Sequence, residues 1–136
     1  MKLIAGNSIA GKSIAGIGTA VPDHKLSLQD TLDAGAAWLA GRPAELALFS
    51  RFAVSSQIQN RHIAFRTEEI LGLNGYPSRL ERFHEVGMNL AERAINAALK
   101  DAGLTVKDVG TIIFTSCTAP SIPSLDTRVI DKLGFS

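Results

Sequence analysis

The stretch Thr111–Phe135, TIIFTSCTAPSIPSLDTRVIDKLGF, decides the fold of this chain because its pattern changes twice along its length. It opens with an apolar run at 111–115, which is rich in β-branched residues and too short for a helix. The run therefore predicts a strand that is covered on both faces. Pro120 and Pro123 follow, and because proline cannot donate a ladder hydrogen bond, they predict a loop.

The second half of the same stretch predicts a helix. Apolar residues recur at helical spacing from 125 to 133, with Ser124 as the expected N-cap and Gly134 as the expected C-terminal stop. Strand, small polar loop and helix follow each other in this order where open α/β sheets place their ligand-binding groups. We therefore expect the functional groups of this stretch in its loop.

Composition and charge restrict the class of protein. The chain has 136 residues, of which 46% are hydrophobic and 20% charged, and a formal net charge of +1. These values are typical of one globular domain, and the net charge is too small to indicate binding to nucleic acid or to an anionic membrane surface. Cys117 is the single cysteine, so an internal disulfide and a cysteine-based metal cluster are both excluded. We expect a cytoplasmic protein without a metal.

The N-terminal segment contains a phosphate-loop pattern. Gly6–Ser13 matches G-x-x-x-x-G-K-[ST], which would bind nucleotide phosphates if a helix followed directly. The next residues, 14–22, instead contain two glycines and a closing proline, and they favour a strand and a turn. Nucleotide binding stays open as one alternative. The other is that residues 1–12 form an extension or an edge segment.

Between these ends, periodicity predicts mainly helices. The pattern indicates a helix at 27–40, a second helix from Arg42-Pro43 onward, an extended segment at 57–65, a loop at 71–77 and a long helix from Ser78 to Gly103. With the strands expected at 14–22 and 111–115, the fold class is α/β with a largely buried sheet.

Three segments resemble a known family. Gly16–Pro22, Ala94–Leu104 and Ile113–Pro123 look like the N-terminal part of a thiolase-fold condensing enzyme. Arg61-His62 and Thr67–Leu71 are most similar to the type III polyketide synthases, the chalcone synthase family. The resemblance implies a layered αβαβα thiolase-like fold of which only the first half is present, with residues 13–136 forming an incomplete half-domain.

The resemblance also implies an activity. Enzymes of the family are acyltransferases that load an acyl-CoA starter onto a cysteine and condense it with malonyl-CoA by decarboxylative Claisen condensation. Their catalytic cysteine, histidine and asparagine match no position here, so we expect no catalytic residue in this chain and no activity from it alone. The implied substrates are CoA thioesters, no cofactor is implied, and the implied assembly is a homodimer or the remainder of the same fold.

The loop residues match pocket positions of the family. Cys117 and Thr118 match neighbouring residues that line its initiation and elongation cavity, and Ile122 matches a residue that reaches across the dimer interface. Two other interpretations of Cys117 remain, a small buried residue at a strand end and a nucleophile. No neighbouring base or helix N-terminus is evident that would activate the thiol.

A basic position of the family matches Arg51, which we expect to contact the CoA phosphates at the tunnel mouth. The flanking lysines of that cluster are replaced by Leu48 and Ser55, so a solvated surface arginine is the alternative. Three other functions also stay open. They are another thiolase-fold condensing enzyme, such as a ketoacyl-ACP synthase III, a phosphate-loop ATPase, and a non-catalytic module that completes the fold of a partner subunit.

Overall fold

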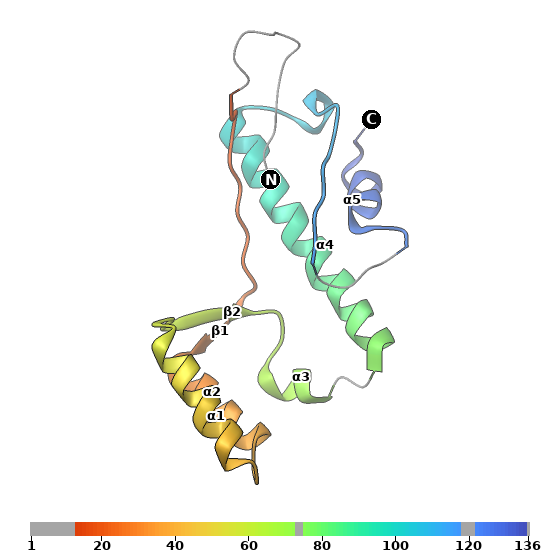
Figure 1. Ribbon diagram of the computed structural model, residues 1–136. Coiled ribbons are helices and arrows are strands. Elements are labelled where there is room, and N and C mark those ends of the chain that lie inside the picture. The colour runs from red at the N-terminus through yellow and green to blue at the C-terminus, as the bar shows by residue number, and fades with distance from the viewer. Residues whose placement is uncertain (1–12, 73–74, 118–121, 136) are drawn as a thin grey trace. The chain divides into compact units, whose positions relative to one another are not determined.

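The computed structural model describes residues 13–72, 75–117 and 122–135, which form two compact units. One unit, here called the strand-pair unit, is Pro22–Leu73. The other, here called the long-helix unit, combines Met1–Val21 with Asn74–Ser136. Figure 1 shows the elements of each. The phosphate-loop pattern, apart from Ser13, and the expected edge segment at 1–12 lie outside the described residues.

The strand-pair unit contains a two-stranded antiparallel sheet and three helices. The strands are β1, His24–Ser27, and β2, Asn60–Ile63, in a register that pairs His24 with Ile63 and Ser27 with Asn60. Between them in the chain lie the helices α1, Leu28–Trp38, and α2, Pro43–Ser55, and after β2 comes α3, Thr67–Gly72. The two helices expected here are confirmed, with ends shifted by one or two residues.

Local sequence explains where these helices begin. Ser27 caps α1, since its hydroxyl accepts a hydrogen bond from the Asp30 N–H at 3.0 Å while Asp30 Oδ2 accepts from the Ser27 N–H at 2.9 Å. Pro43 occupies the first turn of α2, where its missing N–H costs nothing. Gly35 lets the two helices approach, because a Cβ there would lie 2.2 Å from the Phe49 ring.

The long-helix unit is built around α4, Gly75–Ala102, which Gly103 ends with a φ of +65°. The connection that follows contains a 3-10 turn, η1, at Val106–Asp108, and the unit ends with α5, Leu125–Leu133. Gly134 caps α5 in the left-handed conformation, as expected. The start of α4 differs from the prediction, because Ser78 lies inside the helix and its hydroxyl donates to the Gly75 carbonyl at 3.2 Å.

The core of this unit lies along the second half of α4. Its buried members come from α4, the segment after η1 and α5, and they are Ile95, Ala98, Leu99, Val109 and Val129. Leu125 packs against α4 at Gly87, where a Cβ would meet the leucine side chain at 3.3 Å. Farther along, Lys132 Nζ lies 2.6 Å from Glu92 Oε2, so α5 is fixed to α4 at both ends.

An extended segment at 13–18 lies directly on the backbone of α4. A Cβ on Gly18 would be 2.0 Å from the carbonyl oxygen of Ala94, and one on Gly16 would be 2.6 Å from that of Ala98. Both glycines are buried, and between them the N–H of Ile17 donates to Asp101 Oδ2 at 2.9 Å. Only glycine fits this approach, because the atoms it meets belong to the helix backbone.

The strand expected at 111–115 is wrong for this structure. The segment is extended, but no residue of it is in a sheet with the described parts of the chain. Ile112 packs against the α4 core, whereas Ile113 is 79% exposed, so only one face is covered. A strand needs a neighbour for its N–H and C=O groups. The loop expected at 71–77 is also only partly correct, since its described ends belong to α3 and α4.

Candidate functional site

Two of the expected pocket residues in the long-helix unit, Cys117 and Ile122, are solvent-exposed. The thiol of Cys117 is exposed at the end of the extended segment, and its role in a pocket wall stays a prediction. Ile122 is 101% exposed just before α5, and Thr118 lies outside the described residues. The thiol and the isoleucine side chain are thus both accessible to a ligand or to another protein segment.

Arg51, the fourth expected site residue, lies on α2 in the strand-pair unit and is exposed. Its guanidinium carbon is 5.7 Å from the centre of the Phe52 ring, a cation–π distance that leaves the N–H groups free to bind an anion. Leu48 and Ser55, which replace the flanking lysines, are exposed on the same helix. Neither unit holds the complete set of expected residues.

A groove of about 640 Å³ lies next to Arg51. Its walls come from α1, α2 and β2, and the residues that line it are Thr31, Phe49, Phe52, Ala53, Ser55, Ser56 and Arg61. Arg61 Nη2 lies 3.5 Å from Ser56 Oγ, which holds this second guanidinium beside the groove. The groove therefore combines aromatic surface and small hydroxyls with a cation, and Arg51 adds another cation over the ring of Phe52.

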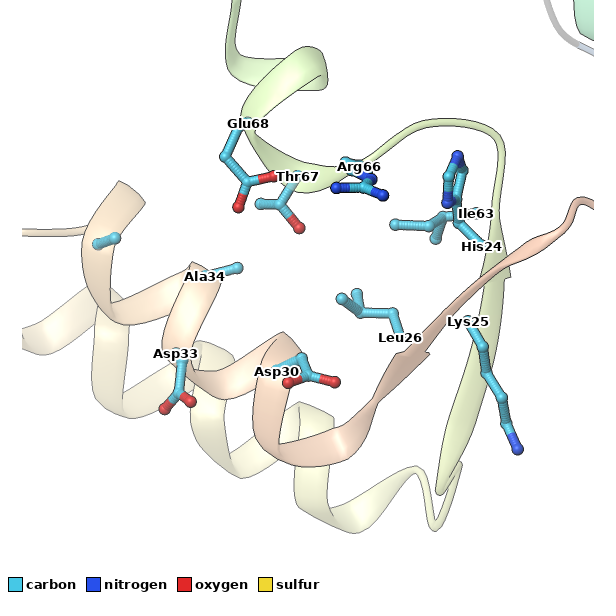
Figure 2. Close-up of a pocket in the computed structure, with 11 residues that line it drawn as sticks. His24, Lys25, Leu26, Asp30, Asp33, Ala34, Ile63, Arg66, Thr67 and Glu68 are labelled. Atoms are coloured by element: carbon cyan, nitrogen blue, oxygen red, sulfur yellow. The ribbon is translucent and has the colours of Figure 1, made fainter.

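A second hollow, of about 620 Å³, lies in the same unit (Figure 2). It is formed by β1, α1, the end of β2 and the start of α3, and its lining residues are His24, Lys25, Leu26, Asp30, Asp33, Ala34, Ala37, Ile63, Arg66, Thr67 and Glu68. In the view, Leu26 and Ala34 point into the hollow, and Arg66 and Thr67 face them from the start of α3. Lys25 and Asp33 point away from it.

Two of the carboxylates at or beside this hollow, those of Asp30 and Glu69, accept local hydrogen bonds. The Ser27 hydroxyl, 2.5 Å from Asp30 Oδ2, and the Ser27 N–H hold the pKa of the Asp30 carboxyl below its ordinary value. The N–H of Arg66 donates to Glu69 Oε2 at 3.2 Å and so orients the first turn of α3. In the parts of the chain that the structure describes, neither the guanidinium of Arg66 nor the carboxylate of Glu68 has a hydrogen-bond or ion-pair partner.

The described residues contain no group of three or more histidine, cysteine, aspartate or glutamate side chains that could hold a metal ion. His62 Nδ1 instead lies 2.8 Å from the backbone oxygen of Pro22, and His84 packs beside Phe83 with ring centres 6.0 Å apart. Nor is any helix within 13–72, 75–117 or 122–135 both long and apolar enough to cross a bilayer.

The hollow at α3 was missed by the sequence analysis. The start of α3 does carry a signal, since Thr67 is followed by Glu68 and Glu69, and acidic residues favour the first turn of a helix. That signal predicts a short helix and no binding site. The hollow needs residues separated by about forty positions to meet, and only the pairing of β1 with β2 brings them together.

Comparison with known proteins identifies the family that the chain resembles. A 1,3,6,8-tetrahydroxynaphthalene synthase from Streptomyces peucetius subsp. caesius is 34% identical over 125 residues, which cover 92% of this chain and 33% of that protein. A phloroglucinol synthase from Pseudomonas fluorescens is 28% identical over 84% of this chain and 32% of its own length. No family model matches the chain.

A solved structure of the same family also matches the chain. The crystal structure of 1,3,6,8-tetrahydroxynaphthalene synthase from Streptomyces coelicolor A3(2), a bacterial type III polyketide synthase, matches with a TM-score of 0.80 and 27% identity. The chain resembles the N-terminal part of the type III polyketide synthases. The match covers 89% of this chain and 35% of the solved one, and the chain spans about a third of the length of the curated relatives it matches.

The structural match also confirms part of the expected fold. The chain superposes on part of the thiolase-like fold of a type III polyketide synthase, while its own described elements are mostly helices with one small two-stranded sheet. The helix α4 and the extended segments beside it are present, whereas the layered sheet is not formed by the described residues.

Proposed function

We propose that this chain is the N-terminal portion of a type III polyketide synthase, an acyltransferase that condenses an acyl-CoA starter with malonyl-CoA by decarboxylative Claisen condensation. The observation that supports this most is the 34% identity to a tetrahydroxynaphthalene synthase over 92% of the chain. The relatives are named after polyhydroxylated aromatic products, and a product of that class is proposed here. We also propose that residues 13–136 form the N-terminal half-domain of a layered thiolase-like fold.

The part of the reaction assigned to this chain is binding. Arg51 would bind the phosphates of CoA, because its exposed guanidinium, 5.7 Å from the centre of the Phe52 ring, can donate several N–H groups to phosphate oxygens. The adjacent groove offers a second cation, Arg61, and the hydroxyls of Ser55 and Ser56. Acyl transfer itself requires a nucleophile and donors aimed at the developing enolate oxygen, and in the family these come from residues outside the present sequence.

The loop residues would shape the cavity in which the polyketide grows. Cys117, Thr118 and Ile122 are proposed as wall residues of this cavity, with Ile122 reaching toward a partner subunit of a homodimer. The exposure of Ile122 at 101% is what such a contact requires of the chain by itself. Larger or smaller side chains at these positions would then change the length of the product.

The experiment uses the protein in the form in which its source cells hold it. Its intact mass is measured first, and release of CoA and carbon dioxide from malonyl-CoA and an acyl-CoA is then followed. Activity that requires both thioesters supports the proposal. Absence of any condensation by that native form, with a range of acyl-CoA starters, overturns it.

A variant tests the role of Arg51. Arg51→Gln should raise the KM for an acyl-CoA about three- to tenfold, because it removes an exposed charge-assisted contact. The KM for an acyl thioester that lacks the nucleotide should not change. Arg79→Gln, at an exposed arginine of α4, is the matched control. Equal effects of Arg51→Gln on both kinds of thioester would contradict phosphate binding.

The second candidate function is a non-catalytic module that completes a partner subunit. It is favoured by large apolar side chains that stay exposed, including Ile17 at 63%, Phe52 at 60% and Ile113 at 79%. Ile17 and Ile113 belong to the long-helix unit and Phe52 to the strand-pair unit, so under this function each unit would meet its own part of the partner. A stable complex with a full-length homologue, without condensation by the chain itself, would favour this function over the first.

A further inference from the structure

The hollow beside α3 combines an apolar floor with unpaired charges of both signs. Leu26 and Ala34 point into it and Ile63 lines it, all three partly buried, so part of its surface is carbon. The guanidinium of Arg66 and the hydroxyl of Thr67 face this floor (Figure 2). An occupant therefore meets an apolar surface on one side and polar groups on the other.

The polar groups of this hollow are acceptors on Asp30, Asp33 and Glu68, donors on Lys25 and Arg66, and His24, which can do either. Glu68 has both carboxylate oxygens free of partners among the described residues, and Asp30 uses Oδ2 for Ser27 and contributes to the lining as well. Both carboxylates accept hydrogen bonds only, while Thr67 can accept or donate. An occupant that supplies several O–H donors would satisfy them.

The charge balance argues against an ionic occupant. Lys25 and Asp33 of the lining carry opposite charges, and both point away from the hollow (Figure 2). An anion would be attracted by Arg66 but repelled by Glu68 and Asp30, and a cation would meet the opposite combination. A neutral molecule avoids both penalties. The guanidinium is planar and stacks on aromatic faces, so a flat aromatic ring can bind to Arg66 without carrying a charge itself.

We propose that the hollow between β1, α1 and α3 binds a neutral, polyhydroxylated aromatic molecule. The ring lies on Leu26 and Ile63 under the guanidinium of Arg66, and its hydroxyls donate to the carboxylates of Glu68 and Asp30. No bond is made or broken in this step. The site is argued from the lining, and its ligand class rests on the product class of the proposed function. Binding is measured without condensation, so the two can fail separately.

The test is calorimetric titration of the native protein with 1,3,5-trihydroxybenzene at neutral pH. We expect saturable binding at one site with a Kd on the order of 1 mM, because the ligand is small and the hollow is open. The matched ligand is 1,3,5-trimethoxybenzene, which keeps the ring but has no O–H donors, and it should not bind measurably. Benzoate, which is flat and anionic, should bind more weakly than the phenol.

Substitutions of lining residues test whether the ligand binds in this hollow. Arg66→Gln and Glu68→Gln should each raise the Kd about fivefold or more, since each removes one of the contacts described above. Both residues are exposed, so the fold should tolerate the changes, and a urea unfolding curve checks this. Arg79→Gln and Glu81→Gln, at exposed positions of α4, are the controls and should leave the Kd unchanged.

Three results would overturn the proposal. One is the absence of saturable binding of the phenol up to about ten times the expected Kd. Another is equal or tighter binding of the trimethoxy compound or of benzoate, which would show that hydroxyl donors and neutrality do not matter. The third is an unchanged Kd in both Arg66→Gln and Glu68→Gln, which would place the binding elsewhere.

Discussion

Replacement of Gly18 by alanine should strongly destabilise the long-helix unit. The added Cβ would lie 2.0 Å from the Ala94 carbonyl oxygen and 2.4 Å from the Ala98 amide nitrogen, far inside the 3.4 Å at which ordinary contacts begin. Both atoms belong to the backbone of α4, so no side chain can rotate away. The segment at 13–18 must instead lift from the helix and strain or lose the bond from the Ile17 N–H to Asp101.

The size of the effect follows from these two losses. Overpacking of a well-packed contact costs about 1–3 kcal/mol, and loss of the Ile17 hydrogen bond adds roughly 1 kcal/mol. We therefore expect Gly18→Ala to lower the free energy of unfolding by about 2–4 kcal/mol. The measurement is urea unfolding of the native form of the protein, with the midpoint and the slope fitted together.

Gly110 is the matched control for this substitution. It lies in the same unit, a Cβ there meets nothing within 4 Å, and its φ is not in the left-handed region. Gly110→Ala should leave the free energy of unfolding unchanged or raise it by up to about 1 kcal/mol, because alanine restricts the unfolded chain. If Gly18→Ala unfolds within about 0.5 kcal/mol of the unchanged protein, the close backbone contact is refuted.

Two further substitutions test the strand-pair unit. Gly35→Ala should cost about 1–3 kcal/mol because its Cβ meets the Phe49 ring, and adding Phe49→Leu should recover part of the loss, since here the obstacle is a side chain that can be shortened. Ser27→Ala should lower the melting temperature at pH 7 by removing the α1 cap. The pKa of Asp30 is lower in the folded protein than its ordinary value of 3.8, so the Ser27 interaction stabilises the fold above pH 3.8 and is lost as the pH falls through the folded pKa. The difference between Ser27→Ala and the unchanged protein in thermal melts should therefore shrink in acid, and a constant difference down to pH 2 would contradict this explanation.

Periodicity predicted the helices well because each carries its own signals. The apolar stripe and Gly103 mark α4 and its end, and Ser124 and Gly134 flank α5, so each signal lies in the helix or directly beside it. The strand β1 was missed, since His24–Ser27 has only four residues, and α3 was missed because a helix of six residues shows less than two turns of pattern. Short elements depend on their neighbours more than on their own residues.

The candidate site could be predicted only where a motif carried it. Arg51 and Cys117 were selected from the family pattern, the structure places both at the surface, and their roles stay predictions. The hollow at Arg66 has no local signature, because its lining comes from three elements that are distant in the chain. The segment 111–115 has a clear local signal that the structure does not follow. Its composition predicts a sheet strand, but pairing depends on neighbouring strands that the described residues do not supply.

The contact between Gly18 and α4 has a consequence for protein engineering. Because backbone meets backbone there, the segment at 13–18 and the alanine positions Ala94, Ala98 and Ala102 can accept changes only as a matched set. A chimera that takes one from this chain and the other from a relative would join surfaces shaped for different neighbours. Crossover points for recombination should therefore lie outside this pair, so that the segment and its helix are inherited together.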